Sequence, residues 1–141
     1  MQEMTSEEVR GFLLAATRTL KLATVRTNGR PHVAPVWFVL DGEEIVFTTP
    51  STSLKARNLG ANPHVSVCVD DERPPFGFVS ATGTATLHPQ PADLLEWTTR
   101  IAARYLGESE AVEAGARNAQ IDDLLVRIRV TRTVAFSGIT A

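Results

Sequence analysis

The sequence lacks the features that mark several common classes of protein. Cys68 is its only cysteine, so no disulfide can form within the chain. No apolar run is long enough to form a transmembrane helix, and the acidic N-terminal segment lacks the basic-then-apolar order of a signal peptide. We therefore expect a cytoplasmic protein that makes no contact with a membrane.

The chain also has little excess charge and few motifs of catalysis. Lys and Arg total 14 and Asp and Glu total 16, which gives a formal net charge of −2 and no broad positive field for nucleic acid. The G-x-G-x-x-G and G-x-S-x-G motifs are absent. His32, His64 and His88 lie far apart and do not have the spacing of metal ligands. We expect no nucleic-acid binding, no metal site and no nucleophilic triad.

What the sequence does contain is a series of strand-like segments joined by turn residues. Residues 31–40 are apolar on both alternating faces, which is typical of a strand buried on both sides. Asn28-Gly29 precedes this segment and Asp41-Gly42 follows it, and both dipeptides favour tight hairpin turns. The other expected strands are residues 20–27, 45–49, 64–69, 76–87 with a bend or bulge at Gly83, and 124–136.

Helical spacing occurs in the segments between these strands. A capping box beginning at Thr5 predicts a first helix, and residues 54–59 form a short helix after a run of hydroxyl residues. Residues 91–107 form a third, with Pro91 in its first turn and an apolar face of Leu94, Trp97, Ile101 and Tyr105. Residues 108–120 have one large apolar side chain, Val112, and form either a marginal helix or a mobile excursion.

These elements predict one domain, residues 1–141, that is mainly β with peripheral helices. The six strands fit a small antiparallel barrel, which leaves few unprotected strand edges. In its last strand Val126, Ile128 and Val130 face inward, while Arg127 and Arg129 lie at a solvated rim. The doubly apolar segment 31–40 needs a cover that one chain does not supply, so we expect a homodimer with binding sites at its interface.

Residues 49–58 have the composition of an anion-binding corner. The hydroxyls of Ser51, Thr52 and Ser53 precede a helix that carries Lys55 and Arg57. Free N–H groups at a helix N-terminus, together with hydroxyls and cations, suit a phosphate group. The alternative is an ordinary capped connector with a charged surface, and spacing alone does not separate the two.

Two longer runs resemble a known family. GRPHVAPVWFVLDG (29–42) and VFTTPSTSLKARNLGANPHVSVCV (46–69) are similar to the FMN-binding split-barrel family that includes pyridoxamine 5′-phosphate oxidase, and most of all to its branch that uses the deazaflavin coenzyme F-420. In that family a Thr pair, a loop with Ser and Lys, and an Asn-Pro segment hold the cofactor phosphate. The matching residues here are Thr48, Thr49, Ser53, Lys55 and Asn62-Pro63.

Two departures from the family pattern bear on the cofactor. Val33 stands where the FMN oxidases place a phosphate-binding Arg, which argues against FMN. The C-terminal run VTRTVAFSGITA contains no His, which argues against the vitamin B6 reaction. Trp37, beside the expected ring site, favours the deazaflavin branch.

The resemblance implies a reductase in which reduced F-420 passes a hydride to an unsaturated small molecule, a chemistry that the cofactor itself supplies. The implied cofactor-binding residues are Ser51, Ser53, Lys55, Arg57 and Asn58 for the phosphate, Thr48 and Thr49 for the polar ring edge or the ribityl chain, and Pro35, Val36 and Trp37 for the ring. Phe78 would approach the cofactor of the other subunit, or simply pack at the interface. No catalytic acid or base is identified.

Three alternatives stay open at this point. The chain could be an FMN-dependent oxidoreductase related to pyridoxamine 5′-phosphate oxidase, with Lys55 and the serines in place of the missing strand arginine. It could be a carrier or sensor that binds a flavin or deazaflavin without turnover. It could also be a dimeric scaffold whose corner binds nothing.

Overall fold

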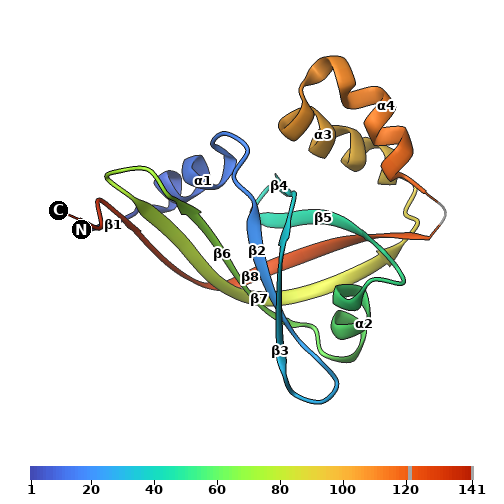
Figure 1. Cartoon of the computed structure of the whole chain (residues 1–141), viewed down its shortest axis with the longest axis horizontal. Coiled ribbons are helices and arrows are strands. Elements are labelled where there is room, and N and C mark those ends of the chain that lie inside the picture. The colour runs from blue at the N-terminus through green and yellow to red at the C-terminus, as the bar shows by residue number, and fades with distance from the viewer. Residues whose placement is uncertain (121, 141) are drawn as a thin grey trace.

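The computed structural model describes residues 1–120 and 122–140, and in them the chain is mainly β (Figure 1). One antiparallel sheet of eight strands follows the order β3-β2-β6-β7-β8-β5-β4, and β1 pairs with β8. The strands are β1 Gln2–Glu3, β2 Leu20–Val25, β3 Pro31–Val36, β4 Val39–Asp41, β5 Glu44–Pro50, β6 His64–Asp71, β7 Gly77–Pro89 and β8 Asp123–Ser137. The helices are α1 Ser6–Leu14, α2 Leu54–Ala61, α3 Leu94–Leu106 and α4 Glu108–Asn118.

The sheet curls, because β3 and β4 stand at opposite ends of the strand order but follow one another in the sequence without pairing. β3 pairs with β2 and β4 pairs with β5, and only Trp37 and Phe38 separate β3 from β4. The prediction of one continuous strand over residues 31–40 is therefore wrong. The strand breaks because the backbone N–H of Phe38 donates to the Tyr105 hydroxyl at 3.2 Å and its carbonyl accepts from Arg104 at 2.8 Å. With this break and the short β1, the sheet has eight strands instead of the six expected.

The predicted turns are confirmed. Asn28-Gly29 lies in the β2–β3 hairpin and Asp41-Gly42 in the β4–β5 hairpin, where Gly29 has φ 84° and Gly42 has φ 59°. The predicted irregularity at Gly83 is a β-bulge, with a register shift between Thr82 and Gly83 opposite β8. A Cβ atom on Gly83 would lie 2.6 Å from the carbonyl oxygen of Arg129, so only glycine fits there.

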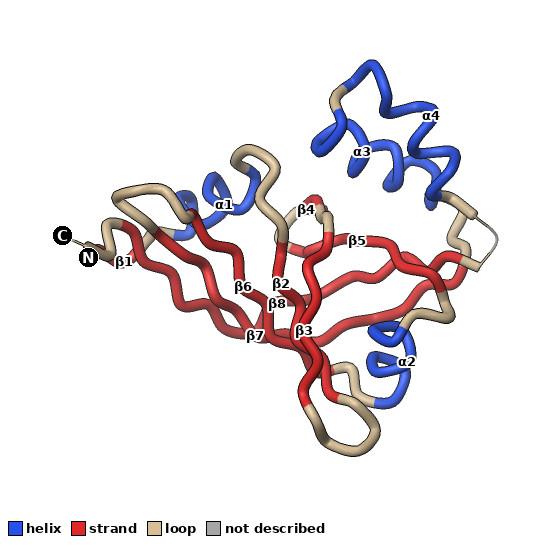
Figure 2. Tube along the Cα trace, viewed as in Figure 1, coloured by secondary structure: helices blue, strands red, loops and turns tan. Residues whose placement is uncertain are grey.

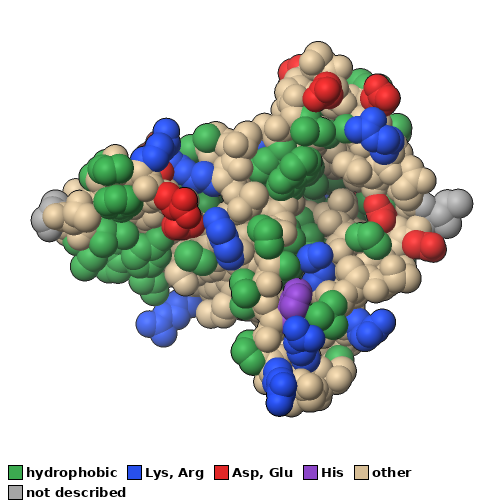
Figure 3. All heavy atoms as spheres, in the orientation of Figure 1, with side chains coloured by type: hydrophobic (Ala, Val, Ile, Leu, Met, Phe, Trp, Pro, Cys, Tyr) green, Lys and Arg blue, Asp and Glu red, His purple; other side chains and the backbone are tan. Residues whose placement is uncertain are grey.

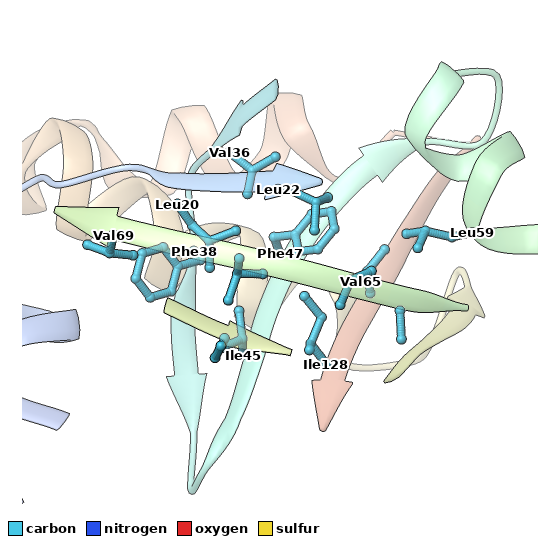
Figure 4. Packing of buried hydrophobic residues seen from close by; sticks show 14 residues of the cluster. Leu20, Leu22, Val36, Phe38, Ile45, Phe47, Leu59, Val65, Val69 and Ile128 are labelled. Atoms are coloured by element: carbon cyan, nitrogen blue, oxygen red, sulfur yellow. The ribbon is translucent and has the colours of Figure 1, made fainter. Parts of the chain in front are cut away.

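The barrel interior is filled by apolar side chains from all its walls. Phe38 and Phe47 are fully buried and face Leu20, Leu22 and Ile128 across the interior (Figure 4). The inward set predicted for β8 is confirmed, since Val126 and Ile128 are buried and Val130 is half-buried. On β6, Val65, Val67 and Val69 are buried. Cys68 on the outer side of β6 is a half-buried free thiol whose pKa is raised by burial.

The helices α3 and α4 form an antiparallel pair, and α3 packs on the barrel through Leu94 and Trp97, which cluster with Val46 and Leu125 (Figure 2). Residues 108–118 are helical because the small residues Ala111, Ala114 and Gly115 bring α4 close to α3, while Val112 is 76% exposed. The hydroxyl of Thr98 donates to the carbonyl of Gly115 at 2.8 Å and joins the two helices. No helix in residues 1–120 or 122–140 is both long enough and apolar enough to cross a bilayer.

Two further expectations are corrected. Pro91 precedes α3 instead of lying in its first turn, and its carbonyl accepts the N–H of Leu94 at 3.1 Å. Arg127 was expected at a solvated rim, but its side chain is only 18% exposed and its guanidinium pairs with Asp41 at 2.7 Å. The pKa of Arg127 is raised, first by this hydrogen bond with Asp41. Arg129, in contrast, is exposed as predicted.

Candidate functional site

The end of β5 and the start of α2 form a corner fixed by two hydroxyls. The hydroxyl of Ser53 caps α2 by accepting the N–H of Ala56 at 3.1 Å. It also lies 2.8 Å from the hydroxyl of Thr49, which is buried. Within the described chain the N–H groups of Leu54 and Lys55 have no acceptor. The first turn of α2 therefore presents two free amide donors.

Cations gather around this corner. Figure 3 shows several Lys and Arg side chains over the β2–β3 hairpin and α2, while other Lys and Arg side chains lie near α1 and α4 among the acidic ones. Lys55 is half-buried on α2, Arg57 is exposed on the same helix, and Arg26 and Arg30 flank the hairpin turn. No acid of the described residues lies within ion-pair distance of any of the four. Their uncompensated charge favours an anion at this place.

The remaining residues predicted to bind the phosphate or the ribityl chain differ in their exposure to solvent. Ser51 is exposed, and its N–H donates to the carbonyl of Asp122 at 2.7 Å while its hydroxyl has no partner in the described chain. Thr48 is half-buried on β5. Asn58 is 1% exposed, and its amide donates to the hydroxyl of Thr24 at 3.0 Å. Asn58 thus fastens α2 to β2 and is not open to a ligand from solvent.

The predicted ring wall lies at the end of β3. Pro35 and Trp37 are exposed, whereas Val36 between them points into the core. Trp37 stacks on Tyr105 with ring centroids 4.8 Å apart and an interplanar angle of 5°. Because Trp37 is still 41% exposed, part of its ring is free to contact a ligand.

Two residues of α3 that sequence reasoning did not assign to the site hold this wall in place. The Tyr105 hydroxyl accepts the N–H of Phe38 and donates to the carbonyl of Arg18 at 2.9 Å. Arg104 donates to the carbonyls of Phe38 and Leu13. Burial raises the pKa of Tyr105 and lowers the pKa of Arg104. The sequence signal for Tyr105 was its place in an apolar helical stripe, which predicts packing only.

The corner and the ring wall lie at opposite ends of β3. His32 stands opposite Thr24, to which Asn58 of α2 is bonded, so α2 adjoins the first residues of β3. From His32 to Trp37 the chain advances by about five residues, roughly 17 Å. The Nδ1 atom of His32 is buried and has no hydrogen-bond partner among the described residues, so a polar group is still unsatisfied next to the corner.

Phe78 is not brought to this site within one chain. It lies at the start of β7, 6.0 Å from the ring of Phe136, whereas α2 adjoins the other end of β7 through the bond from Ala85 N–H to the Pro63 carbonyl. Phe78 and Ala85 are about seven residues apart on one strand, roughly 23 Å. Phe78 can reach the corner only from a second copy.

A cavity of the described chain lies elsewhere. It has a volume of about 590 Å³ and lies beneath α1, between the β4–β5 hairpin and β8. None of the predicted site residues lines it. At the corner and the ring wall, Ser51, Pro35 and Trp37 are exposed on the surface of the single chain.

Comparisons with known proteins agree with this fold. A family model described as pyridoxamine 5′-phosphate oxidase matches residues 5–135. The conserved hypothetical protein Rv2991 from Mycobacterium tuberculosis is 27% identical, with a TM-score of 0.83 over 96% of this chain and 86% of its own. An F420 reductase is 29% identical, with a TM-score of 0.71 over 87% of this chain and 94% of its own.

Other relatives share the fold alone. HutZ, the heme storage protein from Vibrio cholerae, is 23% identical, with a TM-score of 0.75 over 96% of this chain and 98% of its own. No curated protein has a significantly similar sequence.

Proposed function

Because the chain belongs to the pyridoxamine 5′-phosphate oxidase family, we propose that it is an oxidoreductase that uses the deazaflavin coenzyme F-420 to reduce an unsaturated small molecule. The observation that carries the proposal is the corner at α2, where half-buried Lys55 lacks an acid partner in the described chain and adjoins two free backbone amides. A cation and free amide donors that share one corner attract a phosphate group.

The residues present fit a phosphate-bearing cofactor with a planar ring. Lys55, the hydroxyl of Ser51 and the amides of Leu54 and Lys55 would hold the phosphate. The roughly 17 Å along β3 from His32, beside this corner, to Trp37 would be covered by the ribityl chain and the tricyclic ring together. Pro35 and the free part of Trp37 would support the ring. Thr48 lies on β5, the strand that leads into α2.

The chain's own contribution to the chemistry is positioning and exclusion of water. When bound, reduced F-420 supplies the hydride. The wall formed by Pro35 and Trp37 is apolar, and none of these side chains is ionisable, so it orients rings without transferring protons. Tyr105 keeps Trp37 in place through the ring stack and is held neutral by its raised pKa. The proton that completes the reduction would come from solvent.

A second copy of the chain completes this site in our proposal. The outer face of β3, β2, β6, β7 and β8 carries rows of small side chains in register. One row is Val33, Ala23, Ser66, Thr82 and Arg132, and the next is Pro35, Lys21, Cys68, Ser80 and Val134. Val33 is 65% exposed in the single chain, and a face of mostly small side chains without acids in these two rows suits a self-complementary contact. Phe78 lies on this face too and would come from the partner.

Titration of the purified protein with F-420, and separately with FMN, tests the cofactor assignment through quenching of Trp37 and Trp97 fluorescence. We expect micromolar or tighter binding of F-420 and weaker binding of FMN. Lys55→Ala should weaken F-420 binding at least tenfold, about 1.4 kcal/mol. Arg117→Ala, which removes an exposed cation of α4, is the matched control and should leave the affinity unchanged.

Three outcomes would change the assignment. An affinity of Lys55→Ala within twofold of the wild type would contradict the phosphate corner. Preference for FMN would make the protein a flavin oxidoreductase. Tight F-420 binding without reduction of any conjugated acceptor would make it a carrier or sensor.

A further inference from the structure

The barrel wall has an opening beside β8 that α1 covers. The β5 ladder along β8 stops at Ile128, and the β1 ladder starts at Phe136. Between them, residues 129–134 have no strand on that edge, although β7 pairs with the other edge. α1 lies over this opening and buries none of its own residues completely, so it is a loose cover. The cavity of about 590 Å³ lies beneath it.

The floor and roof of this cavity are apolar. Val67, Val79, Ala81 and Ile45 form the floor on the inner faces of three strands, β6, β7 and β5. The roof is formed by Val9 and Leu13 of α1 and by Leu40 of the β4–β5 hairpin. A volume of this size is typical of cavities that bind small molecules, and its lining suits a hydrocarbon body.

The rim of the cavity is charged unevenly. On the hairpin side, Glu44 pairs with Arg127 at 3.3 Å and Arg10 donates to the carbonyl of Gly42, while Glu43 is next to them in the chain. Glu3 lies at the β1 end. On the β8 side, Arg129 and Arg132 are exposed and have no acid partner in the described chain. The β8 side of the rim is therefore the place for an anionic head group.

We propose that this cavity binds a single-chain amphipathic carboxylate of the medium-chain fatty acid type. The hydrocarbon chain lies on the floor of Val67, Val79 and Ala81, and the carboxylate pairs with Arg129 and Arg132. The site is separate from the cofactor corner, because none of the residues proposed to hold the cofactor lines it. It therefore does not depend on the proposed reductase function.

Calorimetric titration of the full chain with decanoate, and with decanol as the uncharged analogue, tests this inference. We expect one decanoate site per chain and at least tenfold weaker binding of decanol. The Arg129→Gln/Arg132→Gln variant should lose the preference for decanoate, while its affinity for decanol stays within twofold. Arg26→Gln/Arg30→Gln removes the same charge from the distant β2–β3 hairpin and should bind decanoate like the wild type.

A second variant tests the floor. Ala81→Leu fills the cavity and should weaken both ligands at least tenfold, provided that its circular dichroism spectrum matches the wild type. Absence of decanoate binding, equal binding of decanoate and decanol, or full binding by Arg129→Gln/Arg132→Gln would each overturn the proposal. The affinity for F-420, measured on Ala81→Leu, should not change, and this keeps failure at this site distinct from failure of the cofactor assignment.

Discussion

Tyr105 is the only tyrosine of the chain, and it joins three parts of the molecule. Its ring stacks on Trp37, and its hydroxyl binds the backbone of Phe38 from the link between β3 and β4 and the backbone of Arg18 from the segment before β2. Because this hydroxyl is taken out of water, its pKa lies above the ordinary value of 10.0. The consequence is a pH dependence of stability that one residue controls.

We predict that Tyr105→Phe flattens the loss of stability above pH 10. In the unfolded chain Tyr105 ionises near pH 10, whereas in the folded chain it keeps its proton to higher pH. The unfolded state then binds fewer protons, so the free energy of unfolding falls as pH rises past 10. The variant loses about 1–2 kcal/mol at pH 7 with its hydrogen bonds, but it lacks this additional fall.

Urea denaturation at pH 7, 9 and 10.5 measures the effect, and absorbance at 295 nm follows the ionisation of this one phenol. The lysines ionise equally in the wild type and the variant, so they cancel in the difference. Parallel loss of stability in the two proteins above pH 10 would show that Tyr105 is not the group responsible.

At the residue scale, the sequence predicts side-chain chemistry but not side-chain access. Lys55 and Asn58 stand one turn apart on the same helix and both looked available to a phosphate. Asn58 is closed to solvent because Thr24, 34 residues away, meets its amide inside the barrel. No local pattern encodes that meeting, since it depends on how α2 docks on β2.

The helix pair α3–α4 depends on close contact between small residues. A Cβ atom on Gly115 would lie 2.8 Å from Cα of Thr99, which leaves no room for a side chain. We therefore predict that Gly115→Ala separates the helices and lowers the free energy of unfolding by about 1–3 kcal/mol. Denaturation in urea, followed by circular dichroism, measures the change.

Gly11→Ala is the opposite case on α1. No atom lies within 4 Å of the Cβ position there, and alanine favours helix. The same measurement should show a gain of about 0.5–1 kcal/mol. A loss at Gly11 similar to that at Gly115 would contradict this explanation, because it would show that the free space at Gly11 does not decide the effect of the substitution.

At the scale of elements, local turn chemistry made the hairpins and the bulge predictable. Asn28-Gly29, Asp41-Gly42 and Gly83 each act within a few residues, so their effect is visible in the sequence. The break between β3 and β4 was not predictable, because Tyr105 and Arg104 cause it from 67 and 66 residues away. Residues 108–118 gave a weak helix signal because Ala and Gly pack closely without forming an apolar stripe.

For the whole molecule, the decisive prediction concerns the second copy. Ser66 lies at the centre of the outer sheet face and is exposed in one chain. Ser66→Arg should convert a dimer to a monomer, because an unpaired arginine would have to be buried at the contact. Sedimentation velocity measures this, and F-420 affinity should fall in the same variant because the partner completes the site.

Ser109→Arg places the same charge on exposed α4 and serves as the control. It should leave both the sedimentation coefficient and the F-420 affinity unchanged. A wild-type monomer that binds F-420 tightly would contradict the shared site, and a dimer that survives Ser66→Arg would place the contact on another face.

The pairing of β8 with β1, β5 and β7 has a consequence for the order in which the chain can fold. Among the strands, β8 pairs with the most neighbours and follows all of them in the sequence. Until β8 is present, β1, β5 and β7 each have one edge without its final partner. Contacts between distant segments form slowly, and unpaired strand edges are prone to aggregation. Chains truncated ahead of β8 should therefore stay unfolded, which circular dichroism of the truncated protein would check.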